Sequence, residues 1–349
     1  MRIRRFVSLL ATVVLVVGLA AAVGSAAFRA ASGPDMTTAA QKWIGSLSAE
    51  QKAKSVLDYG APVRTDWHFI PKATRKGLQI REMNPDQRAA AHSLLKASLS
   101  EIGYGKVTKI MELENVLKEL EKTRTNSPLR DAERYYFTVF GEPKETGRWG
   151  LSIEGHHMSF NFVVDGGKVI SSTPSMFGTN PATLKGQDVA GVKAGTRILA
   201  QEEQLAFDLL ASLNPEQRKA AVFAEKALDE VRTAGAALPP AEAPVGIVGS
   251  KLNDQQKKLL RELIGVYASA MPEEAAKART AEVDTDGVDG IHFGWAGADK
   301  TGIGHYYRVQ GKTFVIEFVN TQPDSAGNPA NHIHCTWRDL RGDFALPIK

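Results

Sequence analysis

Two pairs of histidines are the residues of this chain best suited to metal or acid–base chemistry. His156 and His157 are neighbours, and His332 and His334 are separated by one residue, so these motifs hold half of the eight histidines. Both segments alternate apolar and polar residues, which predicts β-strands. Strand side chains alternate between two faces, so His332 and His334 share one face with Arg338. Two imidazoles placed in this way can bind a single metal ion or hold one anionic group.

The first pair is expected to contribute one imidazole to the same place. Neighbours on a regular strand face opposite ways, so His157 shares a face with Ser159 and Asn161, whereas His156 faces the other way. We therefore expect His157, His332 and His334 to be the metal ligands, with Glu317 and Arg338 nearby as catalytic candidates. Three imidazoles and a carboxylate suit a single divalent ion of zinc, copper or iron.

Other roles stay open for these residues. Buried histidines are often hydrogen-bonded to a carbonyl or carboxylate without any metal. Arg338 suits a carboxylate or phosphate group of a ligand, and it can equally pair with Asp339 or Asp343. The remaining pocket candidates are His156, His68, Trp67, Ser159, Asn161, His305 and Tyr307.

Cys335 is the single cysteine of the chain, so no intramolecular disulfide can form. It falls on the predicted apolar face of its strand, together with Ile333 and Trp337. A lone cysteine in this position is typical of a small buried hydrophobic residue and not of a nucleophile.

The N-terminus has the pattern of an export signal. Arg2, Arg4 and Arg5 precede an uncharged apolar run from Phe6 to Gly24, and small residues follow at positions 25–27. This pattern predicts a signal peptide over residues 1–27, which places the mature protein outside the cytoplasm, in the periplasm or secreted. The run is long enough for the alternative of an uncleaved membrane anchor.

Removal of residues 1–27 lowers the formal net charge from +4 to about +1, because this segment carries three arginines and no acid. The rest of the chain shows no basic stripe, so we expect no nucleic-acid partner. No dinucleotide fingerprint, P-loop or nucleophile elbow is present, so we expect no nucleotide cofactor. We therefore expect the partner of this protein to be a small-molecule or anionic substrate.

The chain repeats itself. Four helix starts have Ser or Asn at the N-cap and Gln three residues later: Ser48, Asn84, Asn214 and Asn253. The segments 147–163 and 303–319 align with each other as hairpins. We interpret this as an internal duplication within one domain, residues 28–349, whose halves span about 37–180 and 195–349.

The expected fold class is α+β, with helices packed against antiparallel hairpins and the two halves related by a pseudo-twofold axis. Each hairpin has one apolar face for the helices to cover. These faces are formed by Met158, Phe160 and Phe162 in the first half and by Phe314, Ile316 and Phe318 in the second.

Several of these segments together resemble the domain-of-unknown-function 3500 family of bacterial and fungal proteins. The resemblance implies a shared fold and pocket over roughly residues 40–345, and no activity. Where the family has a small polar residue after the last histidine, this chain has Cys335. The matching residues are Trp67-His68-Phe69-Ile70-Pro71, Gly77-Leu78, Leu99-Ser100, Gly103-Tyr104, Phe140-Gly141-Glu142-Pro143, Trp149-Gly150, Gly155-His156-His157-Met158-Ser159, Glu202-Glu203, His305-Tyr306-Tyr307, Asn331-His332-Ile333-His334 and Trp337-Arg338-Asp339.

Two functions follow from these observations. The first is an exported, metal-dependent enzyme, with hydrolysis favoured over copper or iron redox chemistry because no second redox centre is visible. The alternative is a non-catalytic extracytoplasmic protein that binds a ligand and whose histidines are structural.

Overall fold

The computed structural model describes residues 33–123 and 127–348, so the predicted signal segment lies outside the described residues. Within these two ranges the chain forms helices and one large sheet, as the expected α+β class requires. In this part of the chain no helix is both long and apolar enough to cross a membrane.

The helices and strands follow each other in the same order in the two parts of the chain, apart from one additional strand, β6, in the first part. The first part contains α1 (Gly33–Ser46), α2 (Ala49–Ser55), β1 (Val56–Leu57), β2 (Leu78–Gln79), α3 (Pro85–Ser98), α4 (Glu101–Leu120), β3 (Tyr136–Phe140), β4 (Arg148–Gly155), β5 (Met158–Asp165), β6 (Lys168–Ser171) and β7 (Ser175–Thr179). The second contains α5 (Ala200–Ser212), α6 (Pro215–Ala221), β8 (Val222–Ala224), β9 (Ile247–Val248), α7 (Asp254–Ala268), α8 (Glu273–Asp286), β10 (His292–Gly297), β11 (His305–Gln310), β12 (Phe314–Gln322) and β13 (His332–Asp339).

The sheet has the strand order β1-β3-β4-β5-β7-β13-β12-β11-β10-β8, and β7 and β13 join the two parts at its centre. It is mixed and not purely antiparallel, because β1 pairs with β3, and β8 with β10, in parallel. The physical reason is the connection between them: α3 and α4 lie between β1 and β3, and such helical crossovers return the chain in the same direction.

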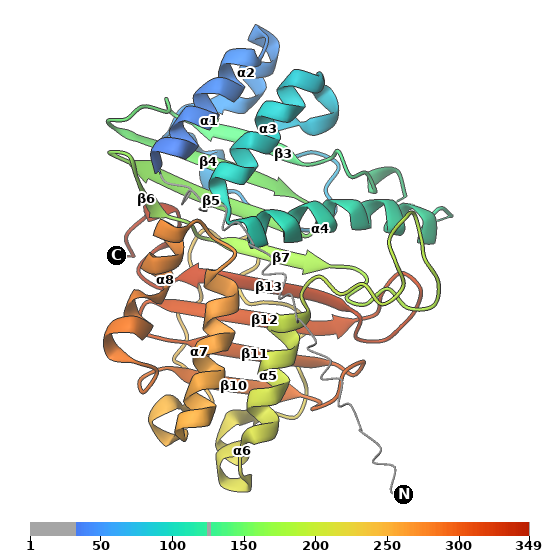
Figure 1. Ribbon diagram of the computed structural model, residues 1–349, viewed down its shortest axis with the longest axis vertical. Coiled ribbons are helices and arrows are strands. Elements are labelled where there is room, and N and C mark those ends of the chain that lie inside the picture. The colour runs from blue at the N-terminus through green and yellow to red at the C-terminus, as the bar shows by residue number, and fades with distance from the viewer. Residues whose placement is uncertain (1–32, 124–126, 349) are drawn as a thin grey trace, which may run out of the picture.

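The helices lie over one face of the sheet, as Figure 1 shows for α1, α3 and α4 on the first part and for α5 and α7 on the second. The predicted apolar faces of both hairpins are buried in the main core under these helices. Leu94 and Leu95 of α3 and Leu260 and Leu263 of α7 are fully buried in the same core. Burial of such side chains contributes about 1.5–3 kcal/mol each.

Two long loops, residues 58–77 and 225–246, lie against the other face. The Trp67 indole Nε1 donates to the Ala236 carbonyl oxygen across 2.8 Å, which joins the loops. The loops are tied to the polar side chains of the strands, for example by the Arg232–Glu317 ion pair of 2.9 Å. Pro239 and Pro240 of the second loop are buried, so this part of the loop is covered.

The predicted helix starts are confirmed: α2, α3, α6 and α7 each begin with a complete capping box. The Gln51 and Gln87 side chains of the first part hydrogen-bond to each other, and Gln217 and Gln256 do the same in the second. The segments 147–163 and 303–319 both contain antiparallel hairpins. Superposition of the two parts by a pseudo-twofold axis stays a prediction.

Candidate metal centre

Three adjacent strands in the middle of the sheet bring the two histidine motifs together at one end of these strands. β7 lies between β5 and β13 and pairs with both. His334 is in register with Gly178 of β7, and Gly178 N donates to the backbone oxygen of His157 across 2.8 Å. Residues 175 positions apart thereby become neighbours.

His156 and His157 do not lie on a strand, which corrects the prediction made from strand parity. They form the two-residue connection between β4 and β5, and His157 has a left-handed backbone with φ of 61°. This region is uncommon for residues other than glycine and costs about 1 kcal/mol or more. Because the chain reverses here, the two neighbouring imidazoles stack, with ring centroids 3.7 Å apart.

Gly178 provides the space for the His157 ring. A Cβ at this position would lie 2.7 Å from His157 Cδ2 and 3.0 Å from the Ile333 carbonyl oxygen. Any side chain would therefore push the imidazole away from β13. The local sequence thus combines a turn that projects His157 with a glycine that admits its ring.

The three predicted ligands converge. His157 Nε2 lies 2.7 Å from His332 Nε2, and one ring nitrogen from each of His157, His332 and His334 falls within 4.8 Å of the others. The parity prediction for β13 is confirmed, because Ile333, Cys335 and Trp337 lie in the main core on the opposite face.

Glu230 orients His334. Its carboxylate oxygens lie 2.8 and 3.0 Å from His334 Nδ1, so Nδ1 carries the proton and donates it to the carboxylate. The lone pair of His334 is then on Nε2. A carboxylate bound to the far nitrogen of an imidazole is the usual outer partner of a metal-ligating histidine, since it fixes the tautomer and the ring orientation.

His332 is held by two asparagines. Asn180 Nδ2 lies 3.4 Å from His332 Nδ1, and Asn320 Oδ1 accepts from His332 N across 3.0 Å. His332 is partly exposed, whereas His157 and His334 are buried. His332 is therefore the one of the three imidazoles that solvent contacts.

Burial keeps two of the three imidazoles, those of His157 and His332, neutral at neutral pH. It lowers the pKa of His157 well below the usual value, and neighbouring imidazoles lower it further. Burial, with the positive charge of Arg130 and the proximity of His334, lowers the pKa of His332 to about 3. Metal binding needs neutral imidazole, so these two ligands are available without loss of a proton.

A second group lies behind His157. His156 Nδ1 is 2.5 Å from Glu114 Oε1 on α4, and Arg130 Nη1 is 3.0 Å from the same nitrogen. Burial raises the pKa of Glu114 to about 8, and burial together with Arg130 lowers that of His156. Both pKa shifts favour a protonated Glu114 that donates a hydrogen bond to a neutral His156. This pair fixes the ring on which His157 stacks.

Phe69 covers the site from the 58–77 loop. Its backbone oxygen accepts from His157 N across 2.8 Å, and its ring centroid lies 4.8 Å from that of His334. The neighbouring candidates have other partners: His68 Nδ1 accepts from Phe69 N, and Trp67 binds Ala236. Trp67 and His68 thus belong to the loop that covers the imidazoles and not to the ligand set.

Glu317 and Arg338 lie on the same face of the sheet as the histidines but in separate ion pairs. Glu317 accepts from Tyr306 and Arg232 at 2.6 and 2.9 Å, and Arg338 donates to Asp343 at 2.5 Å. Arg338 is four residues beyond His334, which is about 13 Å on a strand. Glu317 lies on β12 opposite Thr336, and its carboxylate is held by Tyr306 and Arg232. The structure therefore does not bring either side chain to the imidazoles.

The other pocket candidates divide between the two faces. Asn161 Nδ2 donates to Ser159 Oγ and to the Pro174 carbonyl oxygen, so both polar groups of β5 are used locally. His305 and Tyr307 face the helices, which separates them from the histidine cluster: His305 Nε2 lies 3.2 Å from Glu203 Oε1, and Tyr307 donates to the Glu202 carbonyl oxygen. Alternation along β11 directs both toward α5.

Sequence reasoning missed Glu230, Glu114 and Phe69. Glu114 left a signal, because it lies three or four residues from Ile110 and Leu117, on the apolar stripe of α4, where a carboxylate needs a buried partner. Glu230 left none, since it lies in an irregular loop whose path depends on the whole sheet.

The arrangement offers three converging nitrogen ligands, an outer carboxylate and one partly exposed side. When bound, a divalent ion with three protein ligands supplies an open coordination position for water or substrate. Charge-assisted binding of an anion by the same imidazoles would need their protonation, which the low pKa values of His157 and His332 oppose.

Comparison with known families supports the resemblance noted from the motifs. Residues 29–346 match the model of a family described as a protein of unknown function, DUF3500. No curated protein and no solved structure matched the chain. The matched range covers nearly the whole chain and includes both histidine motifs. The chain therefore belongs to the DUF3500 family.

Proposed function

We propose that this protein is an exported, metal-dependent enzyme whose single divalent ion is bound by His157, His332 and His334. The observation that carries the proposal is the contact between Glu230 and His334 Nδ1, at 2.8 Å. It commits the lone pair of His334 to Nε2, the nitrogen free to join the other two ligands.

The type of ligand narrows the choice of metal. Three imidazoles without a thiolate suit zinc, copper or iron, and Cys335 lies on the opposite face of β13. We favour zinc and hydrolysis, because three protein nitrogens leave the open position that hydrolytic zinc sites use. The partly exposed side of His332 is the proposed approach for a small-molecule or anionic substrate.

Metal analysis of the full chain, purified without an affinity tag, tests the proposal. We expect about one equivalent of metal, and its loss in His332→Ala and in His334→Ala, with circular dichroism unchanged. His92→Ala is the matched control, since His92 lies on α3 and contacts Tyr104. Zinc with hydrolysis of ester or phosphate probes supports the hydrolase, whereas copper or iron supports an oxidoreductase.

A specific distance favours the second candidate, a non-catalytic ligand-binding protein. Two nitrogens bound to one tetrahedral zinc ion lie about 3.3 Å apart, whereas the His157 and His332 Nε2 atoms are 2.7 Å apart, as in a direct hydrogen bond. Metal-free protein that takes up no zinc, copper or iron, and keeps this histidine pair in a crystal structure, would establish the second candidate and refute the first.

We further propose that the chain arose by internal duplication, with a pseudo-twofold axis between β7 and β13. Support comes from the matching order of elements and from the paired glutamines at the four capped helices. The histidine site would then be an asymmetric addition, since Thr313 and Val315 occupy the positions that align with His157 and Ser159.

A further inference from the structure

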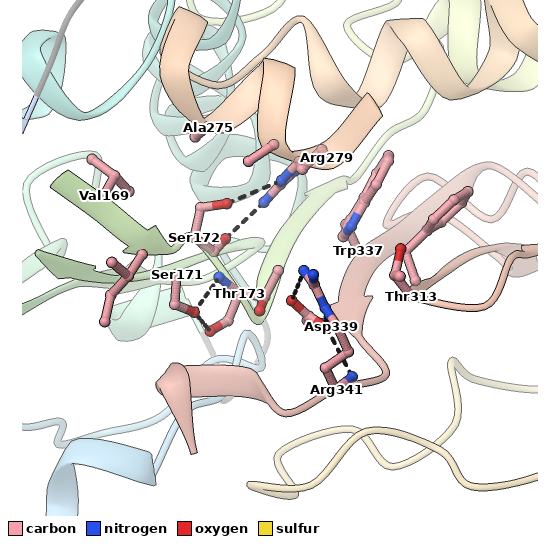
Figure 2. A pocket seen from close by; sticks show the side chains of 13 residues that line it. Val169, Ser171, Ser172, Thr173, Ala275, Arg279, Thr313, Trp337, Asp339 and Arg341 are labelled. Carbon is pink, nitrogen blue, oxygen red and sulfur yellow. Dashed lines mark hydrogen bonds and ion pairs between the residues drawn. The ribbon is translucent and has the colours of Figure 1, made fainter. Parts of the chain in front are cut away.

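A small pocket lies at the other end of β13 from the histidines. Figure 2 shows it between the β6 segment, α8 and the last residues of β13, with Arg279 of α8 pointing toward Ser172 and lying beside Trp337. Its volume is about 50 Å³, room for a few water molecules or one small ligand.

Arg279 is buried and uses three of its five N–H groups on protein atoms. Nε donates to Ser172 Oγ across 3.1 Å, and Nη2 donates to the Ser172 carbonyl oxygen and to Ser175 Oγ across 2.7 and 2.9 Å. The two N–H groups of Nη1 have no protein acceptor among the described residues. Nη1 is therefore the part of the guanidinium that is free to donate to a ligand in the pocket.

No carboxylate within residues 33–123 and 127–348 lies in ion-pair range of Arg279. The two nearest acids are already paired: Asp343 with Arg338, and Asp339 with Arg341 through Nε and Nη2 at 3.0 and 2.8 Å. The pocket is therefore lined by two arginines and one aspartate, with one positive charge in excess. Burial lowers the pKa of Arg279 to about 9, so it is protonated at neutral pH.

The rest of the lining has a hydroxyl side, formed by Ser171, Ser172, Thr173 and Thr313, and an apolar side that contains Trp337 and Phe314. The Arg279 guanidinium lies 5.0 Å from the centroid of the Trp337 ring, and Val169, Ala275 and Phe314 also line the pocket. The apolar side favours an organic anion with a short hydrocarbon part over a strongly hydrated inorganic ion.

We propose that this pocket binds a small organic monocarboxylate, with one carboxylate oxygen accepting from Arg279 Nη1 and the hydrocarbon part against Trp337. The contact is to a single nitrogen, because Ser172 and Ser175 occupy the remaining donors. The site lies apart from the histidines, so it does not depend on the function proposed for them.

Propionate is the probe for the full-length protein. Thermal unfolding is followed during titration at constant ionic strength, with phosphate in a parallel series. We expect a saturable rise in Tm with propionate and an apparent Kd at least tenfold weaker for phosphate. Arg279→Gln should remove the saturable part, whereas Arg261→Gln, a half-exposed arginine of α7, should keep it.

Ala278→Leu provides a second variant in case Arg279→Gln does not fold. Ala278 lines the pocket and is exposed, so a leucine there narrows the pocket without entering the core. It should lose the saturable response while it keeps the Tm measured without propionate. The proposal is overturned if wild type shows no saturable response, if either variant keeps it, or if phosphate binds as tightly as propionate.

Discussion

Weak acid should make the metal-free protein less stable, because the unfolded chain binds a proton at His332 that the folded protein does not. The folded-state pKa of His332 is about 3, against 6.5 for a free histidine. A base whose pKa is lowered on folding contributes its full stability above pH 6.5 and loses it as the pH falls toward 3, because only the unfolded state binds the proton. The loss at pH 5, 1.5 units below the unfolded pKa, is about 2 kcal/mol.

Two features of the site affect the size of this loss of stability. His332 is partly exposed, so solvent screening makes 2 kcal/mol an upper value for this residue alone. His157 also makes the folded protein less stable in acid, since burial lowers its pKa well below the usual value. The total loss between about pH 7.5 and about pH 5 should therefore be on the order of 2 kcal/mol or more.

Urea unfolding of chelator-treated protein at the two pH values measures this loss. His332→Gln should reduce the pH dependence by up to about 2 kcal/mol. Asn331→Ala is the matched control: it removes hydrogen bonds to Thr183 and Asp324 and no titrating group, so it should lower stability equally at both pH values. Equal pH dependence in wild type and His332→Gln would refute the reasoning.

Three further predictions concern the core, the turn and the N-terminus. Trp337→Ala should cost about 3–5 kcal/mol in urea unfolding, because this buried ring stacks on Phe314, and metal content should stay unchanged. Gly178→Ala should weaken zinc affinity at least about tenfold by displacing the His157 ring, as measured by competition with a chromogenic chelator; unchanged affinity would contradict the role assigned to Gly178. Mass spectrometry of protein from its native source should find a mature N-terminus near Phe28, and an intact Met1 segment would show that residues 1–27 are retained.

Much of the fold could be predicted from local patterns. The capping boxes at α2, α3, α6 and α7 depend on side chains three residues apart, and the apolar alternation of β5 and β12 decides which face meets the helices. The parallel pairing of β1 with β3 was missed. It depends on the path of the chain through α3 and α4, which no short pattern contains.

The site was predictable to the extent that it follows strand parity. His332 and His334 share a face of β13 as expected, but Arg338 lies too far along this strand to join them, and Glu317 is bound to Tyr306 and Arg232. His157 did reach the cluster, although by a turn and not by the predicted strand face. Parity states which face a side chain occupies, whereas convergence also needs the register between strands, and this is set by the pairing of β7 with β13.

The metal-free and metal-bound states of the histidine cluster need protons on different ring nitrogens. In the metal-free state one Nε2 of the His157–His332 pair must carry the proton that joins them. As metal ligands, all three rings would present Nε2 lone pairs and would therefore carry protons on Nδ1. Glu230 already accepts such a proton from His334, but Asn180 directs its Nδ2 at His332 Nδ1, a donor facing what would become a donor. Metal binding at His332 therefore requires the Asn180 amide to turn so that Oδ1 faces the ring, which also removes its bond from Ser325 N.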